Sequence, residues 1–563
     1  MRKRWQIRKV NEAYLYRLME ALSIPKVAAR VLLNRGITTT EAGRDFLSPS
    51  LECLLELCAL PGVEKAAQVI GQAIRHNARL VIFGDYDVDG LTASAILARF
   101  LRCLSESAEV YIPSRFVEGY GLTEQAALRL LGLRPHLVIT VDCGIRDFLG
   151  AEVLRNHGVG LVIVDHHLPD GPCFPQAEAI VSTFDLESKK PLSYLSGAGL
   201  ALVLVQALAM YLGVDVNPEE SYLDLACLGT VGDAVPLLGE NRVIAKYGLE
   251  HLRRFPSSGI LALLEVAGIN KEDVDVHEIS FILAPRINAA GRVEHPRFAL
   301  ELLLCEEYGE ALEKARYLNL LNGRRQRDEE RVFEDIYSNE ETHRFLEDEI
   351  VVLLGKDWNV GVLGIVASRL SERLNRPVIV LGEKNGMAVG SGRSIEGFNL
   401  TEALGACQSL LVRYGGHEMA VGLRLEVENV PLFRERVNTL FGDRVRALRL
   451  SSGLVVDAVV GLADLNQKFL EFWERLKPFG EKNPNPLLAT LNVALVKKSW
   501  GRGENQVWLC VSQGKERQEA VVFGGKEKAG ELLESSLVDL AFEVRCNASR
   551  SPYLKLHDWR IKK

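Results

Sequence analysis

The chain has 563 residues, which is too many for one hydrophobic core and predicts three or four domains. A net charge of -7 excludes general affinity for nucleic acid, so a polyanion would have to bind in a local basic cleft or through a bridging metal. No apolar run approaches the roughly 18 to 20 residues of a membrane span, and the basic start MRKRWQIRKV lacks the apolar segment of a signal peptide. The ten cysteines are scattered without close pairs, which is typical of free thiols. These features predict a cytoplasmic protein with no membrane partner.

Residues 1–60 mix polar and apolar positions, and TTTEAGRDFLSPS is typical of a helix start followed by a proline-marked stop. We expect a helical cap on the domain that follows. Within residues 61–300, segments of helix length separate the apolar strands LVIF, AEVYIPSR, HLVITVDCG and GLVIVDHH. This alternation is typical of right-handed βαβ units and predicts a doubly wound α/β domain with a parallel sheet.

Three carboxylates follow the strand at residues 80–83 at alternate positions, namely Asp85, Asp87 and Asp89. They precede Gly90 and a helix-like segment, so they are expected at the carboxyl end of the strand, where open α/β sheets bind ligands. Three carboxylates in close proximity repel one another unless a cation holds them. The stretch therefore predicts a divalent metal site.

Two later strands and one turn carry further ligand-type residues. Asp142 follows the strand HLVITV, and Asp165, His166 and His167 end the strand GLVIVD. Asp233 lies in a glycine-bracketed turn. The carboxyl ends of parallel strands meet at one edge of the sheet, and aspartate with histidine suits Mn²⁺ or Mg²⁺ better than a structural zinc.

The second half of the chain predicts further domains. Residues 301–348 form a charged stretch that is typical of a solvated helix and of a connector between domains. Residues 349–450 read as a second α/β domain with glycine-rich turns at SGRS and GGHEMAVG. Residues 451–563 read as short alternating strands with aromatic and basic residues, which favours a small β-barrel that binds nucleic acid. Its candidate contacts are Lys497, Lys498, Trp500, Arg502 and Trp508.

The motifs DYDVDG, VDCG, DHH and GTVGDAVPL, in this order, resemble the four signature motifs of the DHH phosphoesterases. The segments IPSRFVEGYGL, LAPRINAAGR, GSGRSIEGFNL and RYGGHEMAVGL also resemble those of the RecJ single-strand-specific exonucleases. The resemblance implies two α/β domains, DHH and DHHA1, joined by a long helix around a central cleft, with a C-terminal barrel of the OB type. It covers most of the chain.

The resemblance also implies roles for individual residues. Asp87, Asp89, Asp142, His166 and Asp233 would bind the metal, Asp85 would support them, and His167 would lie beside the reacting phosphate; Asp85, Asp142 and His167 are the expected catalytic residues. The expected phosphate and nucleic-acid contacts are Arg115, Tyr120, Arg286, Arg292, Ser391, Arg393 and His417. Such a metal site acidifies a bound water and neutralises the charge that builds on the phosphate.

Two positions near the predicted active site depart from related sequences. Many DHH phosphoesterases have a metal-binding histidine four residues before the ligand aspartate, where this chain has Phe83. Phenylalanine cannot bind a metal, so we expect one firm Mn²⁺ site and a second that fills only with substrate. Relatives also tend to have a histidine where this chain has Asn359.

The expected activity is metal-dependent 5′-to-3′ hydrolysis of single-stranded DNA to mononucleotides, in DNA repair and recombination. The active site would lie in the groove between the two α/β domains, and Arg393 would line a pocket for the 5′ end. A single-strand-binding protein and a helicase are expected partners of a monomeric enzyme. Two alternatives remain open: a DHH phosphoesterase for oligonucleotides, pAp or cyclic dinucleotides, and a non-catalytic DNA-binding scaffold.

Overall fold

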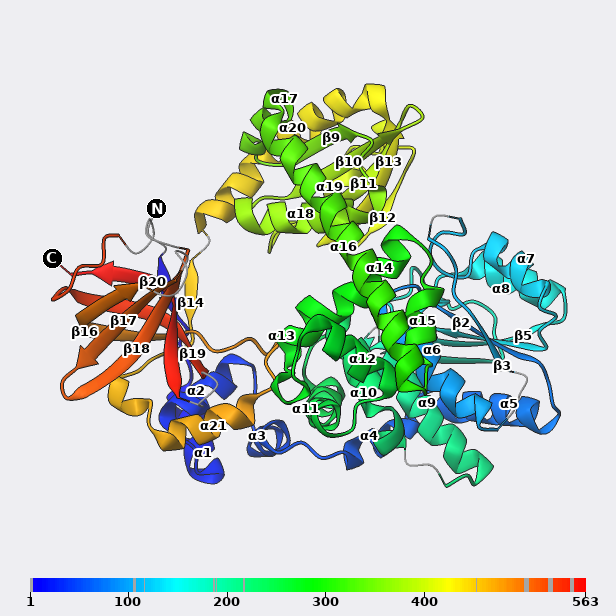
Figure 1. Cartoon of the computed structure of the whole chain (residues 1–563), viewed down its shortest axis with the longest axis horizontal. Coiled ribbons are helices and arrows are strands. Elements are labelled where there is room, and N and C mark those ends of the chain that lie inside the picture. Colours follow the sequence, from blue (N-terminus) through cyan, green and yellow to red (C-terminus); the bar gives the residue numbers. More distant parts are fainter. Residues whose placement is uncertain are drawn as a thin grey trace. The chain divides into compact units, whose positions relative to one another are not determined.

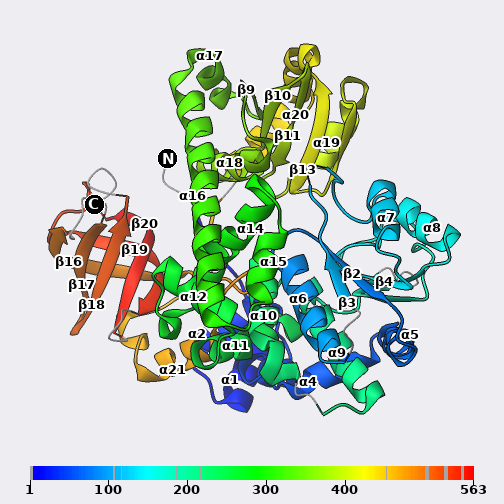
Figure 2. The ribbon, with the colours of Figure 1, turned by 45° about the vertical axis from the view of Figure 1, so that its right-hand side comes forward.

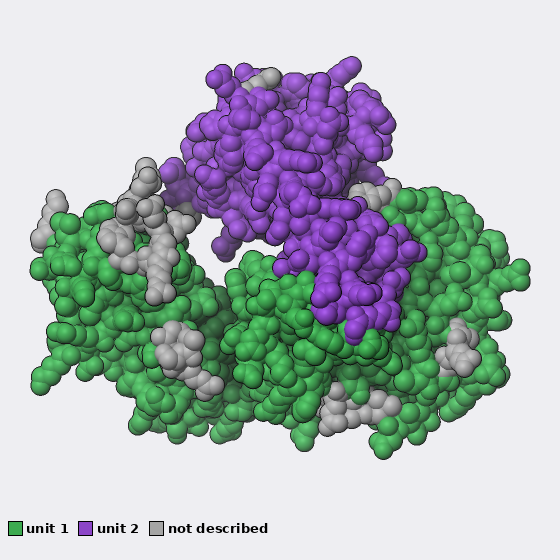
Figure 3. Space-filling view, viewed as in Figure 1, with its two compact units in different colours: residues 1–284, 303–308, 453–563 green, residues 285–302, 309–452 purple. Residues whose placement is uncertain are grey.

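The computed structural model describes residues 4–104, 108–115, 117–185, 188, 190–215, 218–451, 453–500, 506–524, 530–546 and 551–562. The chain divides into two compact units, which Figure 3 shows in different colours. Unit 1 contains residues 1–284, 303–308 and 453–563, and unit 2 contains residues 285–302 and 309–452. None of the helices in the described ranges is long and apolar enough to cross a membrane.

A five-stranded parallel sheet with the strand order β3-β2-β4-β5-β6 lies in unit 1 (Figure 1). The strands are β2 (Leu80–Gly84), β3 (Ala108–Tyr111), β4 (Leu137–Val141), β5 (Gly160–Asp165) and β6 (Ala179–Ser182). Every residue of β2 and β4 is buried, as expected for parallel strands that are covered on both faces. The predicted doubly wound α/β domain is confirmed, and β6 is a strand that the sequence pattern did not indicate.

Helices cover both faces of this sheet. The helices α7 (Glu124–Leu131) and α8 (Phe148–Asn156) share an apolar core with one face. The helices α5 (Val63–Arg75), α6 (Val88–Arg102) and α9 (Gly197–Leu212) pack on the other face. α9 is buried along most of its length because it lies between the sheet side and the next helical layer.

The elements that follow this sheet in unit 1 are mostly helical. They are β7 (Phe184–Asp185), β8 (Lys190–Pro191), α10 (Pro218–Gly232), α11 (Gly239–Arg254), α12 (Ser258–Ala267) and α13 (Val276–Glu278). The helices α14 (Ala284–Val293) and α15 (Arg297–Leu303) fall almost wholly in unit 2.

Unit 2 contains a long helix and a five-stranded sheet. Helix α16 (Tyr308–Ser338) runs without interruption for 31 residues (Figures 1 and 2). The sheet has the order β12-β13-β11-β10-β9, in which only β9 and β10 are parallel. Its strands are β9 (Val351–Lys356), β10 (Val378–Lys384), β11 (Met387–Arg393), β12 (Arg413–Gly416) and β13 (Ala420–Glu426), and its helices are α17 (Glu340–His343), α18 (Val360–Leu374), α19 (Leu400–Ala406) and α20 (Val430–Ser451).

The charged run on α16 is not simply a solvated surface. Glu329 is 1% exposed and Arg325 is 6% exposed. Glu329 forms ion pairs with Arg325 at 3.4 Å and with Arg369 of α18 at 2.6 Å. The expectation of a solvated helix face was therefore wrong for this stripe, because α18 packs on it and supplies a cation that the local sequence does not contain.

The C-terminal part of unit 1 is a closed five-stranded barrel. Its strands are β16 (Leu488–Trp500), β17 (Gln506–Gln513), β18 (Glu516–Phe523), β19 (Leu537–Cys546) and β20 (Pro552–Ile561), and the pairing of β16 with β19 closes it. The short strand β15 (Ala458–Val459) pairs with β16, and helix α21 (Gln467–Leu476) precedes the barrel. The predicted barrel is confirmed.

The N-terminal elements pack on this barrel. They are β1 (Trp5–Ile7), α1 (Glu12–Leu22), α2 (Lys26–Asn34) and α3 (Thr40–Leu47). The next helix, α4 (Glu52–Glu56), contacts α9 instead. Helices α1, α2 and α3 share one apolar core with α21 and the barrel strands, and β1 pairs in parallel with β14 (Leu454–Val456). We expected these helices to cap the domain that follows them, but their main apolar partner comes from the other end of the chain.

Arg242 of α11 links three parts of unit 1. Its side chain is 1% exposed and donates hydrogen bonds to the backbone carbonyls of Phe46, Arg475 and Lys477 at 2.8 to 2.9 Å. Its Nη1 lies 3.4 Å from the carbonyl oxygen of Pro478. Because the carbonyl groups of two distant segments all point at one guanidinium, this residue holds the N-terminal helices and α21 against α11.

Candidate metal centre

The acidic residues that follow β2 are held in place by the backbone. Asp87 is the N-cap of α6, and its Oδ1 accepts hydrogen bonds from the N–H groups of Asp89 and Gly90 at 3.0 and 3.2 Å. A Cβ atom on Gly90 would lie 2.7 Å from the backbone of Asp85, so only glycine fits there. The tight turn from β2 into α6 thus brings Asp85, Asp87 and Asp89 together.

Asp142 follows β4 in a strained backbone conformation. Its φ angle is 62°, in the left-handed region that aspartate tolerates better than most residues. A Cβ atom on Gly197 would lie 2.6 Å from the Cβ of Asp142, so the start of α9 presses against this side chain. Such a conformation persists only where the surrounding structure holds it, and here it places the carboxylate of Asp142 among the other acids of the cluster.

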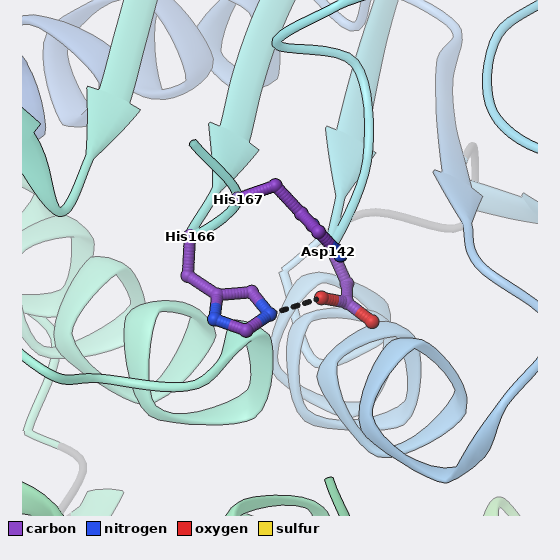
Figure 4. A group of neighbouring side chains, drawn as sticks. All are labelled: Asp142, His166 and His167. Carbon is purple, nitrogen blue, oxygen red and sulfur yellow. Dashed lines mark ion pairs between the residues drawn. The ribbon is translucent and has the colours of Figure 1, made fainter. Parts of the chain in front are cut away.

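His166 lies within ion-pair distance of three aspartates of the cluster, and Figure 4 shows its ring turned toward Asp142. Its Nε2 is 3.1 Å from Oδ1 of Asp142, 3.6 Å from Oδ2 of Asp233 and 3.8 Å from Oδ2 of Asp89. Asp89, His166 and Asp233 offer ligand atoms within 4.8 Å of one another, and Asp142 forms such a group with His166 and His167. The structure thus brings together residues from β4, β5, α6 and the end of α10.

A second group with the same property contains Asp85, Asp87 and Asp142. Phe83 does not take part in this second group. Its ring is fully buried in the apolar core under α7 and α8, and it stacks on Tyr111 with ring centroids 6.0 Å apart. The position that many relatives use for a histidine ligand therefore serves packing in this chain. Asp85, which we expected to support the ligands, is also close enough to Asp87 and Asp142 to offer a ligand atom of its own.

The electrostatics of the cluster favour a bound cation. Burial first, and then repulsion from neighbouring carboxylates, raises the pKa of Asp85, Asp142 and Asp233 well above the ordinary value. Burial raises the pKa of Asp89 to about 7, although the N–H groups of Gly197 and Ala198 donate to it. These carboxylates cannot all be ionised at neutral pH unless a positive charge lies among them.

The donor atoms also fit a divalent metal. The Oδ1 atoms of Asp85 and Asp142 are buried and accept no hydrogen bond from any described residue. Burial and the charge of His167 lower the pKa of His166 to about 4, so its imidazole is neutral and can act as a ligand. Several carboxylate oxygens with one imidazole and no thiolate are a set that suits Mn²⁺ or Mg²⁺.

His167 has a different environment from its neighbour. Its Nδ1 lies 2.7 Å from Oδ1 of Asp165, and its Nε2 lies 3.2 Å from the hydroxyl of Tyr120. Burial lowers the pKa of His167, but the hydrogen bond and charge of Asp165 outweigh burial and raise it to about 9. In the metal-free chain His167 is therefore a cation at neutral pH, and its Nε2 faces the hydroxyl of Tyr120. Asp165 had no predicted role, although its position two residues before His167 is visible in the sequence.

The loop between β3 and α7 carries Arg115 and Tyr120 beside this histidine. The guanidinium of Arg115 lies 4.7 Å from the ring centroid of Tyr86 and donates to its hydroxyl at 3.2 Å. The rings of Tyr86 and Tyr120 meet edge to face at 6.1 Å. Both predicted contact residues therefore belong to one aromatic and cationic group next to the metal-ligand cluster.

A buried carboxylate organises this loop. Glu118 is 7% exposed, accepts from the N–H of Ser114 at 2.9 Å and from Arg129 at 2.8 Å, and contacts the hydroxyl of Tyr111 at 2.5 Å. Glu118 could not be predicted from the sequence, because a single glutamate in a loop carries no recognisable pattern.

The other predicted contacts lie in unit 2. Arg286 donates to the side chain of Asn319 at 3.1 Å, and Arg292 donates to the carbonyl of Gly361 in the first turn of α18 at 3.0 Å. Ser391 and Arg393 lie on β11 against the same helix, since a Cβ atom on Gly364 would lie 3.1 Å from Nη2 of Arg393 and 3.6 Å from Oγ of Ser391. His417 lies in the exposed turn between β12 and β13.

Asn359 has a structural function at the start of α18. It is the N-cap of the helix, where its Oδ1 accepts from the N–H of Gly361 at 2.9 Å. Its Nδ2 donates to Asp328 of α16 at 2.8 Å. The side chain that replaces the histidine of relatives thus ties the long helix to α18.

The predicted barrel contacts are only partly free for a ligand. Lys498 donates to the carbonyl of Leu532, whereas Lys497 is exposed. Trp508 is half-buried and packs against Tyr553 with centroids 5.5 Å apart. Arg502 lies outside the described residues, and so does the side chain of Trp500.

Three family models match the chain. They are the DHH family, N-terminal domain over residues 79–230, the DHHA1 domain over residues 347–443 and the RecJ OB domain over residues 456–554. The first covers the metal-ligand cluster except Asp233, and the other two cover the second sheet and the barrel.

Known proteins match along most of the chain. The single-stranded-DNA-specific exonuclease RecJ of Bacillus subtilis is 36% identical over 562 residues, which are 99% of this chain and 70% of that protein. The crystal structure of RecJ from Thermus thermophilus in complex with Mn²⁺ matches with a TM-score of 0.82 and 30% identity, covering 100% of this chain and 80% of that one. The structure of RecJ from the same organism with Mg²⁺ matches with a TM-score of 0.76 and 28% identity, covering 100% and 79%. By its sequence and by its fold, the chain belongs to the RecJ family of single-stranded-DNA-specific exonucleases.

Proposed function

We propose that the chain is a metal-dependent exonuclease that degrades single-stranded DNA from the 5′ end and releases mononucleotides. The observation that carries this proposal is the convergence of Asp89, Asp142 and Asp233 on His166 from separate elements. The buried Oδ1 of Asp142 accepts no hydrogen bond from any described residue. The RecJ relatives are named as single-stranded-DNA-specific exonucleases, which supports the substrate class. The 5′-to-3′ direction is the part of the proposal that rests on family resemblance alone.

The cofactor is Mn²⁺ or Mg²⁺. We infer that Asp87, Asp89, Asp142, His166 and Asp233 hold one firm ion, and that Asp85 joins Asp87 and Asp142 in a second site that fills with substrate. A divalent ion at this place supplies positive charge to the phosphate and acidifies the attacking water. Because Phe83 is committed to the apolar core, the second site depends on carboxylates alone.

The protein's own contribution to bond cleavage centres on His167. The attack of water on a backbone phosphate expels the 3′ oxygen of the terminal nucleotide, which needs a proton. The cationic His167 carries that proton on Nε2, and Asp165 holds the ring through Nδ1. Tyr120, whose hydroxyl lies 3.2 Å from Nε2, orients the donor before the strand arrives.

We infer that phosphate groups of the strand are bound by two sets of residues. Arg115 and Tyr120 belong to unit 1, and Arg286, Arg292, Ser391, Arg393 and His417 belong to unit 2. Their guanidinium and hydroxyl donors, which suit phosphate oxygens, support this assignment. Arg393 and Ser391 would hold the 5′ phosphate.

We also propose the wider setting of the enzyme. All ten cysteines are free, which supports a reducing cytoplasm. A monomer, and a single-strand-binding protein and a helicase as partners, remain proposals. So does the division into a helical cap (1–60), DHH domain (61–300), connecting helix (301–348), DHHA1 domain (349–450) and OB domain (451–563).

A time course on 5′-labelled and 3′-labelled single strands, with Mn²⁺ or with a chelator, tests the proposal. We expect the 5′ label to appear at once as a mononucleotide and the 3′ label to pass through a ladder of shortening strands, in both cases only with the metal. Release of the 3′ label first would refute the direction. Turnover of a dinucleotide but not of a long strand would favour a small-substrate phosphoesterase, and strand binding without product would favour a scaffold.

A further inference from the structure

The sheet of unit 2 has two unequal faces. On one face, α19 and α20 cover the strands with a continuous apolar core that includes Ile379, Leu423 and Phe433. On the other face, α18 packs on β9, β10 and β11, and its core includes Val378 and Val380. Among the described residues of unit 2, no helix covers β12 and β13 on the α18 side, where Arg413, Gly415, Gly422 and Arg424 are exposed.

Strand register places these residues in rows that continue from the predicted phosphate contacts on β11. Arg393 pairs with Ala420, and Ser391 pairs with Gly422, which in turn pairs with Gly415. The next row on the same face is Val389, Arg424 and Arg413. Because side chains alternate between faces, these rows share the side that α18 leaves open, and successive rows are about 7 Å apart.

The two glycines form a bare floor that packing does not explain. A Cβ atom on Gly415 would meet no atom within 4 Å, and one on Gly422 would meet only a carbonyl oxygen at 4.0 Å. Neither residue has a positive φ angle. Glycine within a strand lowers the stability of the fold. Where neither the available space nor the backbone angle requires a glycine, its presence is typical of a place where a ligand approaches the backbone.

The two arginines beside this floor oppose each other without a counter-charge. Arg413 and Arg424 are a cross-strand pair, and like charges at such positions are destabilising. Both side chains are exposed, and neither guanidinium forms a hydrogen bond or ion pair with any described residue. The acidic residue on the same face of β13 is Glu426, which lies two residues after Arg424 at the end of the strand. An anion between the two arginines would remove their repulsion.

We propose that Arg413 and Arg424, with the floor of Gly415 and Gly422, bind a backbone phosphate of the single-stranded substrate, separate from the phosphate held at Ser391 and Arg393. The charge of the arginines matches a phosphodiester, and the glycine floor admits the flat approach of a sugar–phosphate chain. The assignment rests on the proposed function for the identity of the strand. It adds a second row of phosphate contacts to the nuclease.

The test compares Arg413→Gln, Arg424→Gln and the double variant with Arg436→Gln. Arg436 is also exposed and is on α20, which covers the opposite face of the sheet, so it controls for the loss of one charge from unit 2. Binding of a fluorescent 5′-phosphorylated single strand is measured by anisotropy over a range of salt concentrations in a metal-free buffer. We expect each single variant to bind about fivefold more weakly and to lower the slope of log K against log salt by about 0.7.

Two further readouts separate this site from the catalytic machinery. Turnover of a dinucleotide and the preference for a 5′ phosphate over a 5′ hydroxyl should stay as in the wild type. The variants Arg413→Lys and Arg424→Lys should keep the salt slope, since lysine preserves the charge. The proposal would be overturned if the double variant bound the strand as tightly as Arg436→Gln does. It would also be overturned if the double variant lost as much turnover of the dinucleotide as it loses affinity for the strand. If the wild-type chain binds strands but does not cleave them, the proposed function is refuted. The comparison of binding affinities would still show whether Arg413 and Arg424 bind the strand.

Discussion

Replacing Asp142 by asparagine removes one negative charge from the acidic cluster and keeps the shape of the side chain. The carboxylate of Asp142 accepts no hydrogen bond on its buried Oδ1, and its neighbour His166 is neutral, so neither a hydrogen bond at that atom nor a charged pair is lost. What the substitution removes is repulsion. In metal-free protein, we therefore expect Asp142→Asn to unfold at a higher temperature than the wild type.

The magnitude follows from the spacing of the ligand atoms. Oxygens of Asp85, Asp87 and Asp142 lie within 4.8 Å of one another, and two ionised carboxylates at this distance repel by about 3 kcal/mol at an effective dielectric constant near 20. Partial protonation of the cluster reduces the gain, so we expect the free energy of unfolding to rise by about 2 kcal/mol at pH 8. For a unit of about 400 residues, such as unit 1, the midpoint of thermal unfolding would rise by about 2 to 3 °C.

The sign of the pH dependence is set by the raised pKa values. A carboxyl group whose pKa is higher in the folded than in the unfolded chain destabilises the fold once the pH exceeds the unfolded value, and Asp89 titrates at about 7 in the folded chain. The metal-free wild type should thus lose stability as the pH rises from about 4 through about 7. The advantage of Asp142→Asn should be small at pH 5 and full at pH 8.

Thermal unfolding followed by circular dichroism, in a chelator or in excess Mn²⁺, measures these effects. With Mn²⁺ we expect the order to reverse, because the ion stabilises the wild type and binds the variant poorly, and we expect nuclease turnover to be lost. Asp224→Asn is the matched control: Asp224 is also buried, but it accepts hydrogen bonds from the N–H groups of Leu225 and Ser257 and should lose stability at every pH. An Asp142→Asn protein that is no more stable than the wild type at pH 8 in chelator would refute the electrostatic account.

Three other substitutions probe separate parts of the molecule. Asp165→Asn should lower the pKa of His167 from about 9 toward its ordinary value. The loss of kcat with rising pH should therefore begin about two pH units lower than in the wild type. An unchanged pH profile of kcat would show that His167 is not the proton donor. Arg393→Ala should abolish discrimination between 5′-phosphorylated and 5′-hydroxyl strands in competition assays, whereas Arg436→Ala should leave it intact, and a preserved preference in the first variant would contradict the pocket assignment. Arg242→Met leaves several buried carbonyl groups without a donor and should cost about 3 kcal/mol or more in urea unfolding; wild-type stability would show that α11 does not need this link.

The local sequence was sufficient to predict that the acidic and histidine residues of the candidate metal centre lie together, because their positions follow a simple rule. Apolar runs that end in Asp87, Asp142 and His166 predict buried parallel strands, and the carboxyl ends of parallel strands meet at one edge. The type of side chain then indicates the metal. Nothing about the packing of distant segments is needed for this inference.

Other features depend on contacts that the order of residues does not reveal. Whether Phe83 points toward the metal or into the core is decided by the helices α7 and α8 that cover its face of the sheet. The pKa of His167 depends on a bond distance to Asp165 that spacing alone does not give. The ion pairs of the buried Glu329 depend in part on Arg369, which comes from another helix.

Contacts between distant segments of the chain show most clearly what the sequence decides and what only the tertiary structure decides. The amphipathic pattern of α1 and α2 shows that these helices have an apolar face, but not that the face packs on a barrel more than 400 residues away. In the same way, Arg413 and Arg424 are ordinary surface residues until the register of β12 and β13 sets them opposite each other. Periodicity fixes which face a side chain takes, while only the folded chain, by burying apolar area between distant segments, decides which faces meet.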